Sequence, residues 1–244
     1  MSLDFDSARL PNSFLKPEHH EWRAQLRRFF DREVIPYAAQ WDEDGRIPDE
    51  LWPKSAAVGI LGLGYPEEFG GVTEGIDIWY SIILNEEMAR IAVGGVSATL
   101  LVHGIALPPV INFGSDAIKQ MVAPPVLAGT KRISLGITEP GAGSDVAHLT
   151  TTARLDGDHY VVNGSKTYIT GGMNANWFTT AVRTGGEGAG GVSALLIPAD
   201  AEGVSRTALD KKQGWWCSDT ATIYFDNVRV PVGNLIGQEN KGCR

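Results

Sequence analysis

The stretch Leu135-Gly-Ile-Thr-Glu-Pro-Gly-Ala-Gly-Ser-Asp145 indicates both the fold and the site. It ends an apolar, strand-like run over residues 133–138 in a glycine-rich loop. Gly141 and Gly143 carry no Cβ and can take positive φ, so successive backbone N–H groups can approach a polar ligand closely. Taken alone, such a loop is more often a structural turn between strands. We therefore expect a strand followed by a loop that is able to wrap a polar group.

A second informative segment is Asn163-Gly-Ser-Lys-Thr-Tyr-Ile-Thr-Gly-Gly172. Its Asn-Gly pair predicts a hairpin turn, and the following residues predict a short strand. Side chains alternate along a strand, so Tyr168 and Thr170 are expected on one face. An aromatic ring and a hydroxyl would then stand together.

The chain changes character near residue 131. Before it, apolar residues recur at helical spacing and predict helices over 17–40 with a break at Pro36, 49–58, 76–91, 96–113 and from a Ser115 cap to 127. After it, alternation predicts strands over 150–155, 160–162, 166–170, 177–183, 192–198 and 222–225, with turns at Asp156-Gly157 and Asn163-Gly164. We expect an α+β protein: an all-α domain over residues 1–130, then an antiparallel β-barrel or sandwich over 131–244.

Composition excludes several classes of protein. Of the 244 residues 43% are hydrophobic and 20% charged, as in ordinary globular domains. The net charge of −8 argues against nucleic acid as a partner. No apolar stretch is long enough to span a bilayer, and the first residues are acidic rather than basic, so we expect no membrane insertion and a cytoplasmic protein. Cys217 and Cys243 are expected to be free thiols.

Other candidate sites are weaker. The histidines show no ligand spacing with cysteines or carboxylates, so no metal site is expected. The run of glycines over residues 185–191 contains the spacing of a dinucleotide fingerprint, but a strand follows it where a helix is required, and a hairpin tip is the better interpretation. Glu86 and Glu87 are interpreted as pairing with Arg90 on a solvated helix face. Glu139, next to Pro140, is interpreted as a turn-fixing or solvent-facing residue.

Three ordered motifs give the chain a family resemblance. They are T-E-P-G-A-G-S-D at 138–145, N-G-x-K-x-[WY]-I-T at 163–170, and S-D-T…F-x-[DN]-V-R-V-P at 218–231. In these motifs the chain resembles the acyl-CoA dehydrogenases, flavoenzymes of fatty acid metabolism. The resemblance implies FAD as cofactor and an acyl-CoA thioester as substrate. In that reaction a glutamate removes the α-proton and the β-hydrogen leaves as hydride to the flavin.

The resemblance also implies roles for particular residues. Cofactor contacts fall on Leu135, Ile137, Thr138, Gly143, Ser144, Tyr168, Ile169 and Thr170. Tyr168 would pack against the flavin ring, and Thr170 would donate a hydrogen bond toward its N5 atom. Ser144 would lie near the FAD pyrophosphate and near the pantetheine arm of the substrate. Leu135 stands where some members carry Tyr.

No residue of this chain inherits the catalytic role. The family's glutamate belongs to a carboxy-terminal helical domain, which would lie beyond Arg244, so the chain is expected to be incomplete and inactive by itself. The resemblance further implies an electron-transferring flavoprotein as partner and a homotetramer when complete. Two alternatives stay open: a non-catalytic flavin- or CoA-binding module or partner subunit, and an oxygen-using acyl-CoA oxidase or flavin monooxygenase relative.

Overall fold

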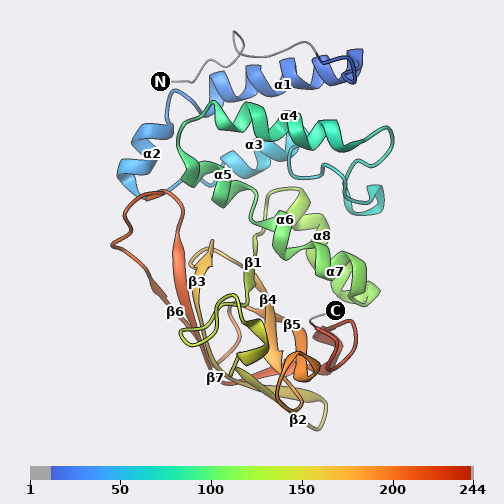
Figure 1. Ribbon diagram of the computed structural model, residues 1–244, viewed down its shortest axis with the longest axis vertical. Helices are drawn as coiled ribbons and strands as arrows, with labels where there is room; N and C mark the ends of the chain where they lie inside the picture. Colours follow the sequence, from blue (N-terminus) through green and yellow to red (C-terminus); the bar gives the residue numbers. More distant parts are fainter. Residues whose placement is uncertain (1–11, 243–244) are drawn as a thin grey trace. The chain divides into compact units, whose positions relative to one another are not determined.

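The computed structural model describes residues 12–242, which form two compact units. The first unit runs to Leu100 and includes the segments Leu127–Thr130 and Gln213–Ser218; the second holds the remaining residues. Helices make up the first unit and an eight-stranded sheet dominates the second (Figure 1), which confirms the expected α+β class. The boundary expected at residue 130 stays a prediction. By their contacts, residues 101–126 belong with the sheet.

The first unit is built on a helix pair. Its elements are α1 (Pro17–Glu33), α2 (Ala38–Asp44), α3 (Leu51–Ala57), the 3₁₀ turn η2 (Glu67–Phe69), α4 (Ile78–Ala89) and α5 (Gly94–Leu100). The break expected at Pro36 is present, because α1 ends at Glu33 and α2 begins at Ala38. α1 packs beside α4 (Figure 1), and the expected stripe on α1 is buried: Trp22, Leu26, Phe29 and Phe30. Burying such side chains contributes roughly 1.5–3 kcal/mol each.

In this unit the prediction for Glu87 is wrong. Glu87 was expected on a solvated face, but its side chain is fully buried on α4 and accepts hydrogen bonds from Arg23 and Arg27 of α1 and from Arg90. Burial by itself would raise the pKa of Glu87, yet the hydrogen bonds from Arg27 and Arg23 outweigh it and the pKa is lowered. Spacing along one helix could not reveal partners on another.

The Glu87 cluster gives a stability prediction. Glu87→Ala leaves three guanidinium groups around an empty acceptor site and should lower the free energy of unfolding by about 3–5 kcal/mol. Glu43→Ala, an equal change of charge at an exposed position on α2, should change it by less than about 0.5 kcal/mol. Urea denaturation followed by circular dichroism measures both. Equal midpoints for the two variants would contradict the clustered role of Glu87.

The second unit carries the sheet. Its strands are β1 (Ile133–Gly136), β2 (Thr152–Asp156), β3 (His159–Thr170), β4 (Trp177–Arg183), β5 (Val192–Pro198), β6 (Val204–Ala208), β7 (Thr220–Pro231) and β8 (Leu235–Ile236). They follow the order β6-β7-β3-β2-β4-β5-β8, and β1 pairs with β4. Most pairs are antiparallel as expected. However, β1 and β2 run parallel to β4, and the strand order is open, without a pairing of β6 to β8 among the described residues.

The helices over residues 94–127 differ in part from expectation. The single helix predicted over 96–113 is wrong: it is α5, then α6 (His103–Ala106) and α7 (Pro108–Phe113). Pro108 and Pro109 supply no N–H groups to a continuing helix, and the apolar run around them concealed the breaks. α8 (Asp116–Leu127) follows as predicted, and the Ser115 hydroxyl accepts the Ile118 N–H at 3.4 Å.

The turn predicted at Asn163-Gly164 is also wrong. β3 continues through it as one strand, and its pairing with β7 shifts register there. Asn163 bonds across the irregularity to Asn227, whose N–H donates to the Asn163 side chain at 2.9 Å. Gly164 has φ 143°, and a Cβ there would lie 2.6 Å from the Thr151 hydroxyl. The Asn-Gly pair therefore marks a bulge rather than a hairpin.

Three further predictions concern the glycine run, the cysteines and membrane-spanning helices. The tip of the hairpin between β4 and β5 holds the glycines of 185–191, as interpreted from sequence, together with the 3₁₀ turn η4 (Ala189–Gly191). Cys217 is buried, and Cys243 lies outside the described residues. Within residues 12–242 no single helix is long and apolar enough to cross a membrane; only α5 with the α6–α7 stretch passes that test, as a bent pair.

Candidate functional site

The glycine-rich loop leaves the end of β1 and is closed at its base. Glu139 and Ala142 exchange two backbone hydrogen bonds, Glu139 N–H to Ala142 O at 2.9 Å and Ala142 N–H to Glu139 O at 3.1 Å. Gly141, enclosed by this bridge, and Gly143 and Ser144, just after it, are exposed. Their backbone N–H groups find no acceptor among the described residues. Exposed donors of this kind, held on a closed base, can face an anion.

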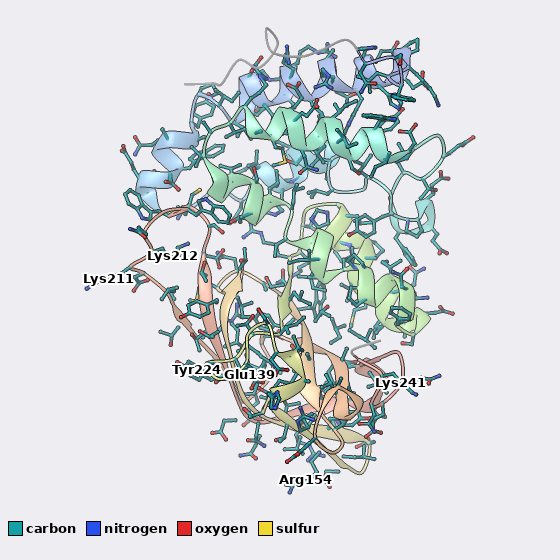
Figure 2. All side chains as sticks on the ribbon, viewed as in Figure 1. Glu139, Arg154, Lys211, Lys212, Tyr224 and Lys241 are labelled. Atoms are coloured by element: carbon teal, nitrogen blue, oxygen red, sulfur yellow. The ribbon has the colours of Figure 1, made fainter. Side chains whose placement is uncertain are left out.

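A buried ion pair fixes this loop to β3. Lys166 Nζ lies 2.7 Å from Glu139 Oε1, and the two side chains are 0% and 2% exposed. Figure 2 labels Glu139 within the sheet unit. The same ammonium donates to the Ile137 carbonyl at 3.1 Å, so one side chain holds both the end of β1 and the start of the loop. Glu139 is therefore turn-fixing, and the alternative that it faces solvent is wrong.

The Glu139 carboxylate is satisfied on all sides. It also accepts the Thr150 N–H at 2.6 Å, the Thr150 hydroxyl at 2.8 Å and the Thr151 N–H at 2.9 Å. Burial opposes the charge, but these hydrogen bonds and that of Lys166 lower the pKa of Glu139 to about 2. Burial lowers the pKa of the Lys166 ammonium, and the nearby carboxylate opposes that effect. At neutral pH the Glu139 carboxylate is ionised.

The second motif meets the first through this pair. The Thr167 N–H donates to the Thr138 carbonyl at 2.8 Å, which joins β3 directly to the start of the loop. Tyr168 follows with φ 57° and is 66% exposed. A left-handed aromatic residue is uncommon and strained, and such strain gathers at functional sites. Ile169 is buried, and Thr170 is half-buried opposite Thr220.

The expected alternation holds only in part. Tyr168 and Thr170 flank the buried Ile169 and both are more exposed than it is, but a register shift between Lys166 and Ile169 interrupts the period of two. Ile169 contributes its side chain to the sheet core. Only its backbone could therefore touch a cofactor.

The turn after Thr170 is held by polar groups that sequence did not predict. Asp219 accepts the Gly171 N–H through its carbonyl at 2.8 Å and the Met173 N–H through its carboxylate at 2.7 Å. Arg206 donates to three carbonyls of this turn, those of Gly172, Met173 and Ala175, and to the Ala199 carbonyl. No spacing rule connects an arginine on β6 with a turn some thirty residues earlier, so this support was missed.

The expected cofactor residues thus form two groups. Ile137 and Thr138 are joined to the β3 segment of Tyr168 by the contacts of Lys166 and Thr167, and Leu135 precedes them on β1 opposite Thr179 of β4. Gly143 and Ser144 lie exposed on the loop, and no hydrogen bond within residues 12–242 joins them to β3. Among residues 12–242 there is no cluster of three or more metal-ligating side chains.

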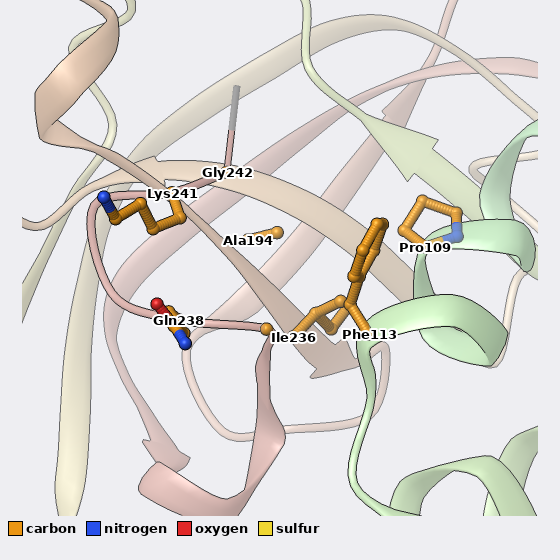
Figure 3. Close-up of a pocket in the computed structure, with 8 residues that line it drawn as sticks. Pro109, Phe113, Ala194, Ile236, Gln238, Lys241 and Gly242 are labelled. Atoms are coloured by element: carbon orange, nitrogen blue, oxygen red, sulfur yellow. The ribbon is translucent and has the colours of Figure 1, made fainter. Parts of the chain in front are cut away.

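A separate cleft of about 710 Å³ lies elsewhere in this unit (Figure 3). Its walls are largely apolar, with Lys241 and Gln238 as the polar side chains; the remaining lining residues are Pro109, Phe113, Ala194, Ile236, Gly237 and Gly242. None of the expected cofactor residues lines it.

Comparison with known proteins identifies the family. The model "Acyl-CoA dehydrogenase, N-terminal domain" matches residues 16–130, and "Acyl-CoA dehydrogenase, middle domain" matches 134–228. An acyl-CoA dehydrogenase of Alternaria alternata is 37% identical over 95% of this chain and 57% of its own length. The chain belongs to the acyl-CoA dehydrogenase family. It spans about 57–60% of the length of the curated relatives that it matches first.

Solved structures agree. A probable acyl-CoA dehydrogenase from Mycobacterium abscessus has a TM-score of 0.90 and 47% identity, over 95% of this chain and 61% of that chain. An acyl-CoA dehydrogenase from Bacillus anthracis, solved in complex with FAD, has a TM-score of 0.85 and 32% identity, over 96% of this chain and 40% of that chain.

Removing the cation of the buried pair should be costly. Lys166→Met leaves the Glu139 carboxylate buried without its counter-ion, and we expect the free energy of unfolding to fall by about 3–5 kcal/mol. Lys211→Met is the control, because Lys211 is exposed in the β6–β7 loop (Figure 2) and should change it by less than about 0.5 kcal/mol. Adding Glu139→Gln to Lys166→Met should recover part of the loss. No recovery in denaturation curves of the double variant would contradict the pairing.

The depressed pKa of Glu139 predicts a pH dependence. Its ordinary value is 4.5 and its value in the folded protein is about 2, so the ionised group stabilises the fold fully above pH 4.5 and loses this effect as pH falls toward 2. The difference in melting temperature between wild type and Glu139→Gln should therefore be largest above about pH 5 and shrink at lower pH. A difference that stays constant from pH 6 to pH 3 would show that Glu139 does not titrate in this range.

Proposed function

We propose that this chain provides the flavin-facing part of an FAD-dependent acyl-CoA dehydrogenase, which desaturates an acyl-CoA thioester between its α and β carbons. One observation carries the proposal: the buried Glu139–Lys166 pair brings the chain's two flavin motifs together and leaves Tyr168 exposed beside Thr138. Because the chain spans only part of its relatives, the activity of the whole protein is included in the proposal.

The residues present fit FAD. The ring of Tyr168 offers an apolar face held in a fixed backbone conformation, which suits stacking against a flat aromatic ring system. The exposed loop offers N–H groups without acceptors, which suits an anionic pyrophosphate. A Cβ built on Gly141 or Gly143 would meet nothing within 4 Å, so the space around the loop is open to a ligand.

Each residue then has a proposed task. Bound FAD supplies the acceptor for the hydride that leaves the β carbon. Leu135 on β1, together with Ile137 and Thr138 just after it, would line the ring, and Tyr168 would pack on it. Thr170 donates a hydrogen bond toward it. Gly143 and Ser144 hold the pyrophosphate, and Ser144 also meets the pantetheine arm of the acyl-CoA. The backbone of Ile169, whose side chain is in the core, completes the contact.

Glu139 is not the base that removes the α-proton. A general base works best with a pKa near the operating pH, whereas Glu139 has a pKa of about 2. Its carboxylate oxygens also already accept hydrogen bonds from Lys166, Thr150 and Thr151. We assign the base to none of the described residues. The family resemblance places it in a carboxy-terminal domain.

Partners and location stay part of the proposal. The resemblance supports an electron-transferring flavoprotein as the acceptor of electrons and a homotetramer as the complete assembly. The proposed location is the cytoplasm.

The visible spectrum of the chain after incubation with FAD and removal of free cofactor tests the proposal. We expect a retained flavin band in wild type and in Tyr224→Ala, which truncates an exposed tyrosine of β7 (Figure 2), and a several-fold higher dissociation constant for FAD in Tyr168→Ala. Adding a medium-chain acyl-CoA should not bleach the band, because no base is assigned here.

Other results separate the alternatives. Bleaching by acyl-CoA would overturn the assignment of the base, and bleaching that reverses with oxygen consumption would favour an oxygen-using relative. A chain that retains no flavin at all would contradict the proposal that it holds FAD by itself.

A further inference from the structure

Arg183, the last residue of β4, joins two loops that are far apart in sequence. Its Nε donates to the Leu149 carbonyl at 2.9 Å and its Nη2 to the Ala147 carbonyl at 2.7 Å. Its Nη1 donates to the carbonyls of Gly186 and Gly188. One guanidinium therefore binds the segment that follows the flavin loop and the glycine-rich tip of the β4–β5 hairpin.

The first of these segments continues the candidate anion-binding loop. The 3₁₀ turn η3 (Val146–His148) begins immediately after Asp145, and the Asp145 carboxylate pairs across it with His148 at 2.6 Å. Through Ala147 and Leu149, Arg183 holds the downstream end of the loop, while Glu139 holds the upstream end. Both anchors meet at Thr151, whose carbonyl accepts the Arg183 N–H at 2.7 Å and whose N–H donates to Glu139.

The second segment gives the glycine run a role. η4 lies beside η3, and Arg183 bonds to Ala147 within η3 and to Gly188, the residue just before η4. The hairpin tip closes on itself through hydrogen bonds from Thr184 and Gly185 to the Gly191 carbonyl. A Cβ on Gly191 would overlap the Gly186 carbonyl and lie 2.9 Å from Arg183 Nη1, whereas one on Gly190 would meet nothing within 4 Å. Glycine at 191 thus lets the hairpin approach the guanidinium.

Arg183 is held by carbonyls rather than by a carboxylate. Within residues 12–242 it forms no ion pair. Its planar fork fixes the direction of each donor, which a flexible ammonium cannot do as well. Its positive charge has no ion-pair partner within residues 12–242 and belongs to the support of a loop whose N–H groups lack acceptors, so the charge and the loop favour the same kind of ligand, an anion.

We propose that Arg183 is a positioning residue for the flavin site: by clamping η3 against the hairpin tip it fixes the 141–145 loop in the conformation that receives the FAD pyrophosphate. The glycine-rich hairpin is then a buttress of the cofactor loop. This inference rests on the proposed function for its ligand, but the clamp itself is a property of the chain without cofactor.

Two pairs of matched variants test the clamp. Arg183→Met removes the fork, and Arg154→Met removes an exposed arginine of β2 (Figure 2) with the same change of charge. Gly191→Ala pushes the hairpin from the guanidinium without touching any charge, and Gly190→Ala adds the same methyl group in open space. Arg183→Lys keeps the charge without the fork. The readouts are the dissociation constant for FAD and amide hydrogen exchange over residues 141–149 without cofactor.

We expect Arg183→Met and Gly191→Ala to weaken FAD binding at least fivefold and to speed exchange over 141–149 at least fivefold, while both controls stay within twofold of wild type. Arg183→Lys should recover only part of the affinity. If Arg183→Met and Gly191→Ala bind FAD as wild type does, or lose stability without a selective change in loop exchange, the positioning role is overturned. If wild type itself binds no FAD, the proposed function fails. The clamp is tested separately by hydrogen exchange over 141–149, and unchanged exchange in Arg183→Met and Gly191→Ala would overturn it.

Discussion

The contact between Glu139 and Lys166 is the constraint on which the second unit depends. Two opposite charges lie 2.7 Å apart with almost no exposure to water, and each also bonds to backbone on a different segment. A buried charge is tolerated only with a complete set of partners, because losing one leaves the other without solvation. The loop base, the end of β1 and the middle of β3 are therefore held in one arrangement. The exposed groups that could face a cofactor are attached to these segments. Their positions are therefore fixed without side-chain contacts between the groups themselves.

Irregularities in β3 place Lys166 and Tyr168 on different faces of the sheet. β3 must present the Lys166 side chain inward and the Tyr168 ring outward, and strict alternation would put both on one face. A bulge near Gly164 and the left-handed backbone at Tyr168 change the phase of the strand before and after Lys166. The strain of Tyr168 is thus part of the construction. A strained aromatic residue with an exposed ring persists only where its surroundings over-determine it, and here β7 and the Thr138–Thr167 contact do so.

Sequence predicted more of the elements than of the contacts. The strands over 177–183 and 192–198 were predicted to the residue, because alternating or continuous apolar runs between turn signals are local properties. The predictions failed where a local signal had a tertiary meaning. Asn163-Gly164 looks like a hairpin turn, but its asparagine pairs with Asn227 across a bulge, and the apolar run over 96–113 conceals the breaks around three short helices. β6 and β8 are short and were missed altogether.

The same distinction applies to the site. The motifs could be found from residue types and spacing. A glycine-rich loop after a strand, and an aromatic residue shortly before a threonine, are local features of the sequence. The supporting groups could not be found in this way. Lys166 lies within a motif, but nothing in the sequence says that it is buried, and Arg183 and Arg206 reach carbonyls that are distant in sequence from them. Sequence therefore indicates which groups a cofactor could touch, while the charges that hold those groups in place emerge only from the fold. Glu139 shows why this matters: the contacts that fix the loop lower the pKa of this motif glutamate to about 2, and a group with that task cannot also serve as a base.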